Sequence, residues 1–250
     1  MNAILLSAVL FAASPSAQPA KSANDPSAIM ILDRMADMIG SLHSCNFRLE
    51  VDQDRFDDAL GTMVKQHNMH DVWMVGPDKM LVNSNGDKGH RGFWYDGKTA
   101  SYYDYQEHNY GRVAAPGNLV AMIDSLHEAY GTDFPAADFF YPTFVSDLIA
   151  QSDKIVFRGT VEIDGRDCFH VVAKGPDQDI QVWIANDATA LPVKYVIRSR
   201  EKNQTSEFSG TFQNWTLNPD LPSAMFGFMA PPGAREVRML SQNSKSGGRP

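Results

Sequence analysis

Basic residues are scarce in this 250-residue chain: 22 Lys and Arg stand against 30 Asp and Glu, which gives a net charge of −8. Nucleic acids and anionic membrane surfaces bind through a basic face, so this deficit argues against both as main partners. Motifs of catalysis are also missing, since the chain has no nucleophile elbow, no glycine-rich phosphate loop and no His-Glu-x-x-His. We therefore expect a protein that is not an enzyme, uses no cofactor and binds no nucleic acid.

Cysteines are equally few, because the chain contains only Cys45 and Cys168. In an exported protein this even count permits one disulfide, whereas two free thiols would behave as small apolar side chains. The sequence does not show that the two residues meet, so both readings stay open. A metal site is not expected either, because His67 and His70 are three residues apart on a strand and point to opposite faces.

The apolar run at the N-terminus is too short to span a bilayer as a helix. It covers Ile4–Ala13, within a first stretch of twenty residues that carries no charged side chain, and Ser14–Ala17 follows. This order is typical of a signal peptide, although a Lys or Arg near the start is missing. We predict a signal peptide over residues 1–20 and a periplasmic protein that does not span the membrane. The alternative is a disordered apolar tail.

Behind this leader, residues 26–42 repeat apolar side chains at helical spacing, and Asp25-Pro26 supplies an N-cap and a first-turn proline. Apolar and polar residues alternate from Cys45 to Asp52, which predicts a half-buried strand. Further strands are expected at 60–75, 79–85, 91–96 and 99–105. From Ile155 to Trp215 short strands joined by turns indicate a meandering antiparallel sheet.

Residues 116–151 interrupt this β-rich chain with two apolar helical stretches, separated at Gly131, and Pro142 divides the second. A sheet of about ten strands has to curl to hide its edges, and apolar helices have to be buried against something. We predict an α+β fold in which a curved antiparallel half-barrel wraps around two or three helices. Residues 25–240 should form a single domain, followed by a disordered tail at 241–250.

Several segments, in their order and spacing, resemble a family of predicted periplasmic bacterial proteins of unknown function that is grouped by fold with the lipoprotein carriers LolA and LolB. The segments are Phe93–Lys98, Pro116-Gly117, Asp167–Val171, Gln181–Ile184, Leu191–Lys194, Phe212–Trp215, Phe226–Phe228 and Pro231–Ala234. The similarity covers most of the chain behind the leader, roughly residues 44–238. The resemblance implies an antiparallel half-barrel with helices in its mouth, and relatives of that shape hold acyl chains or lipoproteins on the concave face.

Two functions follow as hypotheses. In the first, the protein binds or carries a lipid, an acyl chain or a lipoprotein in an apolar cavity between residues 116–151 and the sheet. The residues expected to line this cavity are Phe47, Leu49, Leu126, Phe140, Phe144, Leu148, Val182 and Ile184. In the second, the half-barrel is plugged, and the protein is an envelope sensor or scaffold that acts through contacts with another envelope protein. An enzyme whose site cannot be read from the sequence is a third reading.

Overall fold

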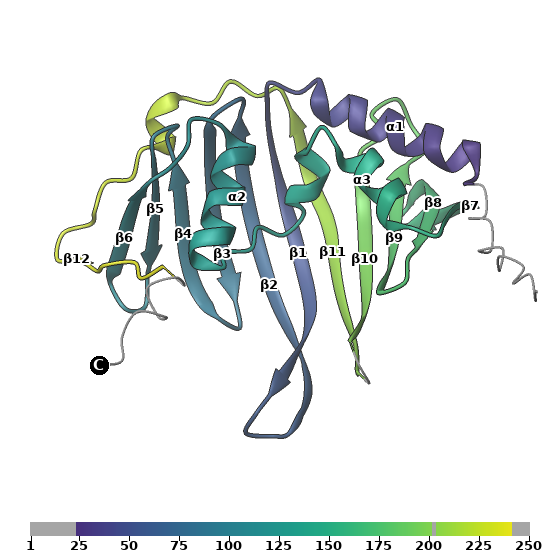
Figure 1. Cartoon of the computed structure of the whole chain (residues 1–250). Helices are drawn as coiled ribbons and strands as arrows, with labels where there is room; N and C mark the ends of the chain where they lie inside the picture. Colours follow the sequence, from purple (N-terminus) through teal and green to yellow (C-terminus); the bar gives the residue numbers. More distant parts are fainter. Residues whose placement is uncertain (1–23, 202–203, 242–250) are drawn as a thin grey trace, which may run out of the picture.

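The structure is a computed structural model that describes residues 24–201 and 204–241 (Figure 1). The predicted signal peptide, residues 1–20, lies outside the described residues, and so does the predicted tail beyond residue 241. The described helices are α1 Pro26–Gly40, α2 Leu119–Tyr130 and α3 Phe144–Gln151, with 3-10 turns η1 Ala137–Phe140 and η2 Ser223–Phe226.

Twelve described strands form one sheet. They are β1 Ser44–Asp57, β2 Thr62–Val75, β3 Lys79–Gly86, β4 Gly89–Tyr95, β5 Thr99–Asp104, β6 Asn109–Ala114, β7 Lys154–Ile163, β8 Arg166–Lys174, β9 Gln178–Ala185, β10 Pro192–Glu201, β11 Gln204–Leu217 and β12 Arg235–Glu236. Their order is β12-β6-β5-β4-β3-β2-β1-β11-β10-β9-β8-β7, so the sheet stays open. Neighbours are antiparallel except for β12, which pairs parallel with β6. The hairpin of β1 and β2 projects beyond the other strands (Figure 1).

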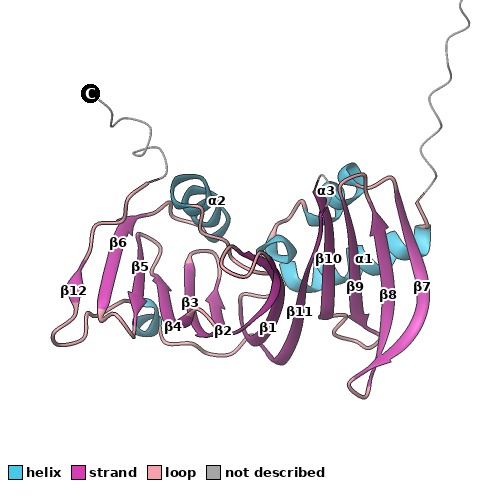
Figure 2. Ribbon diagram, turned by 90° about the horizontal axis from the view of Figure 1, so that it is seen from below, coloured by secondary structure: helices cyan, strands magenta, loops and turns pink. Residues whose placement is uncertain are grey.

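Alternation along the strands gives the sheet one apolar face. On β1, Phe47 and Leu49 are buried in the core, whereas Arg48 between them pairs with Asp71 of β2 on the other face, at 2.7 Å. The apolar face is concave, and α2 and α3 lie in this concavity (Figure 2). The core of the protein is therefore the space between the concave sheet and the helices.

The helix ends follow from local chemistry. α1 begins at Pro26, because the Asp25 carboxylate accepts the Ser27 N–H at 2.9 Å. α2 ends at Tyr130, because Gly131 after it has a left-handed φ of 65°, which disfavours other residues. Pro142 lies between η1 and α3, so the predicted division of the second helical stretch is found in the structure.

The C-terminal segment covers part of the convex face, an arrangement that no pattern in the sequence predicted. Phe226 of η2 is buried, and the Phe228 ring lies 5.0 Å from Trp94 and 5.3 Å from Tyr110, measured between centroids. Trp94 in turn lies over Gly92, where a Cβ would come within 2.2 Å of the indole ring. η2 lies on the side of the sheet opposite α2 (Figure 2). This segment buries an aromatic surface that would otherwise face solvent.

The predicted fold class is confirmed: a curved, open antiparallel sheet surrounds helices. The predicted option of a disulfide between Cys45 and Cys168 is wrong, because both residues are free buried thiols. Cys45 points into the concave core from β1, whereas Cys168 lies on the opposite face of β8, four strands away. At about 4.8 Å per strand the separation is about 19 Å, and a disulfide needs Cα atoms within about 7 Å.

Candidate functional site

The inward side chains of β2 to β5 form three adjacent rows that cross the strands. We name the methionine row (Met74, Met80, Tyr95, Ala100), the valine row (Val72, Val82, Phe93, Tyr102) and the polar row (His70, Ser84, Arg91, Asp104). Neighbouring rows are two residues apart along each strand, which is about 7 Å. The concave face therefore changes from apolar to polar within one step along the strands.

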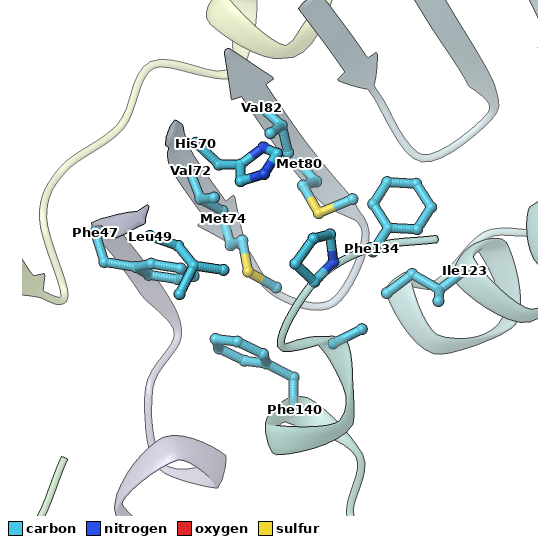
Figure 3. A pocket seen from close by; sticks show the side chains of 12 residues that line it. Phe47, Leu49, His70, Val72, Met74, Met80, Val82, Ile123, Phe134 and Phe140 are labelled. Atoms are coloured by element: carbon cyan, nitrogen blue, oxygen red, sulfur yellow. The ribbon is translucent and has the colours of Figure 1, made fainter. Parts of the chain in front are cut away.

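Residues 116–151, which we call the insert, cover the apolar rows. The ring of Phe134 meets Phe93 edge-on with centroids 5.0 Å apart, and Phe140 stacks on Phe47 at 5.9 Å. A cavity of about 40 Å³ remains between the insert and the sheet. Its lining is Phe47, Leu49, His70, Val72, Met74, Met80, Val82, Ile123, Phe134, Pro135, Ala137 and Phe140 (Figure 3). The thioethers of Met74 and Met80 lie in its middle, and only His70 contributes a polar side chain.

The cavity is too small for a ligand of any length in this conformation. Its volume of about 40 Å³ leaves room for little more than one water molecule. A dry apolar cavity of about 150 Å³ is known to accept a benzene molecule. A lipid chain would therefore enter only if the rings of Phe134 and Phe140 left their places.

The insert is attached to the sheet at its ends. At one end Leu119 N–H donates to the Pro77 carbonyl at 2.9 Å, and after the other end Asp153 N–H donates to the Lys174 carbonyl at 2.7 Å. Between Thr132 and Tyr141, the backbone hydrogen bonds of the described structure all end within the insert, and none reaches the backbone of a strand. The middle of the insert is thus held against the sheet through its side chains, without a backbone ladder to a strand.

His70 is the polar end of the cavity. Its Nδ1 lies 2.7 Å from the hydroxyl oxygen of Ser84, its neighbour in the polar row. Burial lowers the pKa of His70 to about 4, although the nearby carboxylate of Asp71 opposes the shift. The imidazole is therefore neutral near pH 7 and offers hydrogen bonds without a charge.

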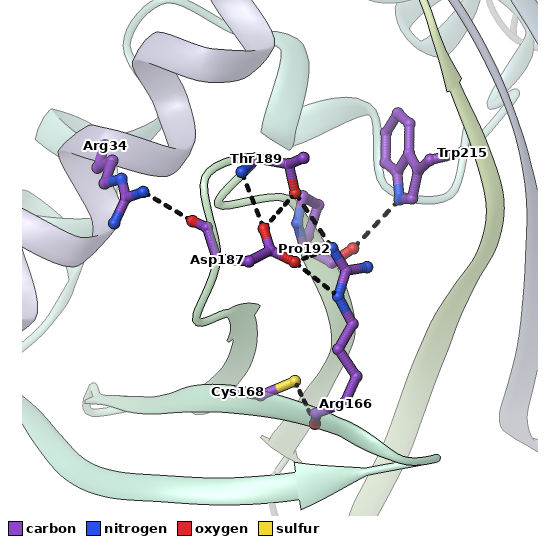
Figure 4. Close-up of polar contacts among 7 residues, drawn as sticks. All are labelled: Arg34, Arg166, Cys168, Asp187, Thr189, Pro192 and Trp215. Atoms are coloured by element: carbon purple, nitrogen blue, oxygen red, sulfur yellow. Dashed lines mark hydrogen bonds and ion pairs between the residues drawn. The ribbon is translucent and has the colours of Figure 1, made fainter.

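The other half of the concavity is filled by α1 and α3, while η1 lies at the boundary between the halves. Polar bonds fix α1 in that half (Figure 4). The Arg34 guanidinium donates to the carbonyl oxygen of Asp187 in the turn after β9, at 2.7 Å. The Asp187 side chain accepts from Thr189 and from Arg166 of β8, which holds its pKa well below the usual range. α1 is thereby joined to a turn that is itself cross-linked to the neighbouring strand.

The structure separates the eight residues that were predicted to line one cavity. Phe47, Leu49 and Phe140 line it. Leu126, Phe144, Leu148, Val182 and Ile184 are buried in the same core but do not line the cavity. Phe144 instead packs on Phe139, with centroids 5.0 Å apart, in the half that α1 fills. The predicted set therefore spans both halves of the concavity, and the cavity lies in one of them.

Sequence reasoning missed most of the lining that β2 and β3 supply. His70, Val72 and Met74 alternate along β2, which is a signal of one inward face that the chain does contain. Met80 and Val82 continue that face on β3 through a hairpin register that the turn defines. No periodic pattern in the sequence could have predicted that Phe134 lines the cavity, because it lies in an irregular loop.

Two further expectations concern metals and membranes. His67 bonds Asp52 at 3.0 Å on the outer face, whereas His70 points into the cavity. In the described part of the chain no group of three His, Cys, Asp or Glu residues is placed to hold a metal ion. None of the described helices is long and apolar enough to cross a membrane.

Solved structures with a similar arrangement share little sequence with this chain. An uncharacterized conserved protein from Thermus thermophilus is 14% identical, with a TM-score of 0.47, over 85% of this chain and 99% of its own. The lipoprotein LppX of Mycobacterium tuberculosis is 16% identical, with a TM-score of 0.45, over 80% and 100%. A LolA superfamily protein from Nitrosomonas europaea is 10% identical, with a TM-score of 0.35, over 80% and 97%.

No curated protein matches the chain. A family match, in contrast, covers residues 28–240 and so includes every described strand, the insert and the cavity. The family is described as "Predicted periplasmic protein (DUF2092)", which confirms both the resemblance noted in the sequence and the predicted compartment. The chain thus belongs to the DUF2092 family of periplasmic proteins.

Proposed function

We propose that this protein is a periplasmic binding or carrier protein, without catalytic activity, that takes up a lipid, an acyl chain or the acyl chain of a lipoprotein between the insert and β1–β3. The observation that supports the proposal most directly is the way in which the insert is attached. The middle of the insert covers two apolar rows without any backbone hydrogen bond to a strand in the described structure. Displacing it would break packing contacts and leave the sheet ladder intact.

The energies favour such an exchange. Exposing Phe134 and Phe140 costs about 1.5–3 kcal/mol for each ring. Burial of an acyl chain contributes about 0.8 kcal/mol per CH₂, so a sixteen-carbon chain contributes about 12 kcal/mol before ordering costs. A long chain can therefore replace both rings and still bind.

A second function is favoured by the small volume of the cavity. At about 40 Å³ the half-barrel is plugged, as a scaffold or sensor that acts through contacts with another envelope protein would be. The projecting β1–β2 hairpin offers such a protein exposed apolar side chains, since Phe56 is 53% exposed and Leu60 is 69% exposed. In this reading the insert never opens.

Mass spectrometry under native conditions separates the two functions. Protein purified from its natural host without detergent should carry a lipid-sized mass increment, and fatty-acid probes should compete with that lipid. A clean mass together with no uptake of any lipid probe would remove the carrier function and leave the scaffold. A closed cavity in the absence of lipid is compatible with both, so the measurement has to include added probe.

A further inference from the structure

The polar row is charged as well as polar. Arg91 faces the concave side of β4, directly opposite Ser84 of β3, which in turn bonds His70 at the end of the cavity. One step along the same strand, Phe93 belongs to the valine row and packs under Phe134. A molecule lying along the strands with its chain in the apolar rows would thus have its end at Arg91.

The guanidinium of Arg91 has a hydrogen-bond donor without a partner. Its nearest carboxylate is that of Asp104, with Nε and Oδ2 3.6 Å apart, which is an ion pair too long for a hydrogen bond. The Arg91 Nε is buried and has no hydrogen-bond partner in the described structure. Asp104 is also occupied, because its Oδ1 accepts the backbone N–H groups of Gln106 and Glu107 at 3.0 Å. The row therefore contains a guanidinium whose buried Nε–H has no hydrogen-bond partner in the described structure.

Lys88 lies near this guanidinium and also near Arg55. The pKa of Lys88 is lowered, first by partial burial and then by the positive charges of Arg55 and Arg91, while Asp133 of the insert acts in the opposite direction. Among the described residues, neither Arg55 nor Lys88 has a carboxylate within ion-pair distance. Lys88 thus adds a second positive charge near Arg91 at the polar end of the apolar rows, in a protein whose net charge is −8.

We propose that the ligand of this site is an anionic amphiphile, a long-chain carboxylate, whose head group binds Arg91 in the polar row while its chain occupies the valine and methionine rows. This inference rests on the proposed function, because the chain takes the place of Phe134 and Phe140. A planar guanidinium matches a carboxylate with two parallel hydrogen bonds. His70 and Ser84 are uncharged and can add hydrogen bonds to the same carboxylate, so the site requires only one negative charge on the ligand.

Calorimetric titration with three amphiphiles of equal chain length tests this assignment: dodecanoate, dodecanol and dodecyltrimethylammonium, each below its aggregation limit. Wild-type protein should bind dodecanoate about tenfold more tightly than dodecanol, and dodecanol more tightly than the cation, because a hydrogen-bonded ionic group contributes about one order of magnitude. Arg91→Gln should remove the preference for dodecanoate and leave dodecanol binding unchanged, which also shows that the variant is folded. Arg198→Gln, which removes an arginine paired with Glu207 on the outer face, should leave all three affinities unchanged.

Different binding results would overturn this inference and the proposed function. Equal binding of dodecanoate and dodecanol by the wild type, or a full preference for dodecanoate in Arg91→Gln, would overturn the role of Arg91 and leave an apolar binding site. Binding of none of the three amphiphiles would overturn both proposals.

Discussion

The two halves of the concave face are covered in different ways. α1 is bonded to the sheet: Asp25 N–H donates to the Ile155 carbonyl at 2.9 Å, and the Asp25 carboxylate accepts the Phe157 N–H at 3.2 Å. The middle of the insert has no such bond to a strand backbone in the described structure. One half of the face therefore has a fixed cover and the other a cover that only packs. The cavity lies under the second.

This difference assigns different tasks to similar apolar side chains. Phe144, which packs on Phe139, belongs to the fixed half and is 8% exposed. Phe140, only four residues earlier, lines the cavity. Buried side chains in the fixed half maintain the fold, whereas the insert side chains that line the cavity, Phe134 and Phe140, are the ones that a ligand would displace.

The largest expected effect on stability comes from placing a charged side chain in each half of the concave face. Phe144→Arg should lower the free energy of unfolding by about 4 kcal/mol or more, because an unpaired guanidinium would enter a filled core. Phe140→Arg should cost about 2 kcal/mol and keep the fold, because the side chain can turn out of the cavity. Urea unfolding monitored by circular dichroism measures both.

Uptake of a fluorescent fatty acid completes this comparison. Phe140→Arg should abolish uptake, whereas the matched control Phe140→Leu should retain it. Equal destabilisation by the two arginine substitutions would show that the halves are packed alike and that the insert is an ordinary part of the core.

Acid should weaken the insert half through His70. Its pKa is about 4 in the folded protein and about 6.5 when unfolded, so the unfolded chain binds more protons between these values. The stability that neutral His70 contributes is complete above about pH 6.5 and is lost as the pH falls toward 4. Between pH 7.5 and pH 5 we expect a loss of about 1–2 kcal/mol from this residue.

The contribution of His70 is isolated by the variant His70→Gln, which should lose less stability than the wild type over the same pH interval. Between pH 7.5 and pH 5 the protection of backbone amides against hydrogen exchange, corrected for the intrinsic rate at each pH, should fall in residues 119–140 of the wild type and stay constant in α1. An identical pH dependence in variant and wild type would mean that His70 does not titrate in this range.

The N-caps of α1 and α2 offer a matched pair of smaller changes. The Asn118 side chain accepts only the Ala121 N–H, at 2.8 Å, so Asn118→Ala should cost about 1 kcal/mol. Asp25 caps α1 and also bonds β7, so Asp25→Ala should cost more than Asn118→Ala. Thermal unfolding of the two variants checks the order, and the reverse order would show that α1 is not fixed through Asp25.

Much of the fold could be predicted because its signals are local. Alternation from Cys45 to Asp52, the Asp25-Pro26 start and the Gly131 stop each depend on neighbouring residues, and each appears in the structure. The cavity depends on contacts between distant segments, such as Phe134 with Phe93 and Phe140 with Phe47. Helical spacing predicted that the insert is buried, but it did not show which half of the sheet each side chain meets.

The polar row could not be predicted from the sequence for the same reason. His70, Ser84, Arg91 and Asp104 come from four strands, and only the pairing register places them side by side. The sequence also gave no indication that Phe226 and Phe228 would cover the convex face, since they follow the last predicted strand.

The smallest effect should come from a bond inside the insert. The Tyr141 hydroxyl donates to the Asp124 carboxylate at 2.7 Å and so joins the segment before α3 to α2. The two residues move together only while this bond holds, and its loss costs about 0.6 kcal/mol at an exposed site. Tyr141→Phe should therefore leave global unfolding almost unchanged and raise the population of open insert, and with it the rate of probe uptake, about threefold. Stopped-flow fluorescence measures the rate, and Tyr130→Phe, a change on α2 away from this bond, serves as the control. An unchanged uptake rate in Tyr141→Phe, with normal uptake in the control, would mean that the insert opens without separating α2 from its second helical stretch.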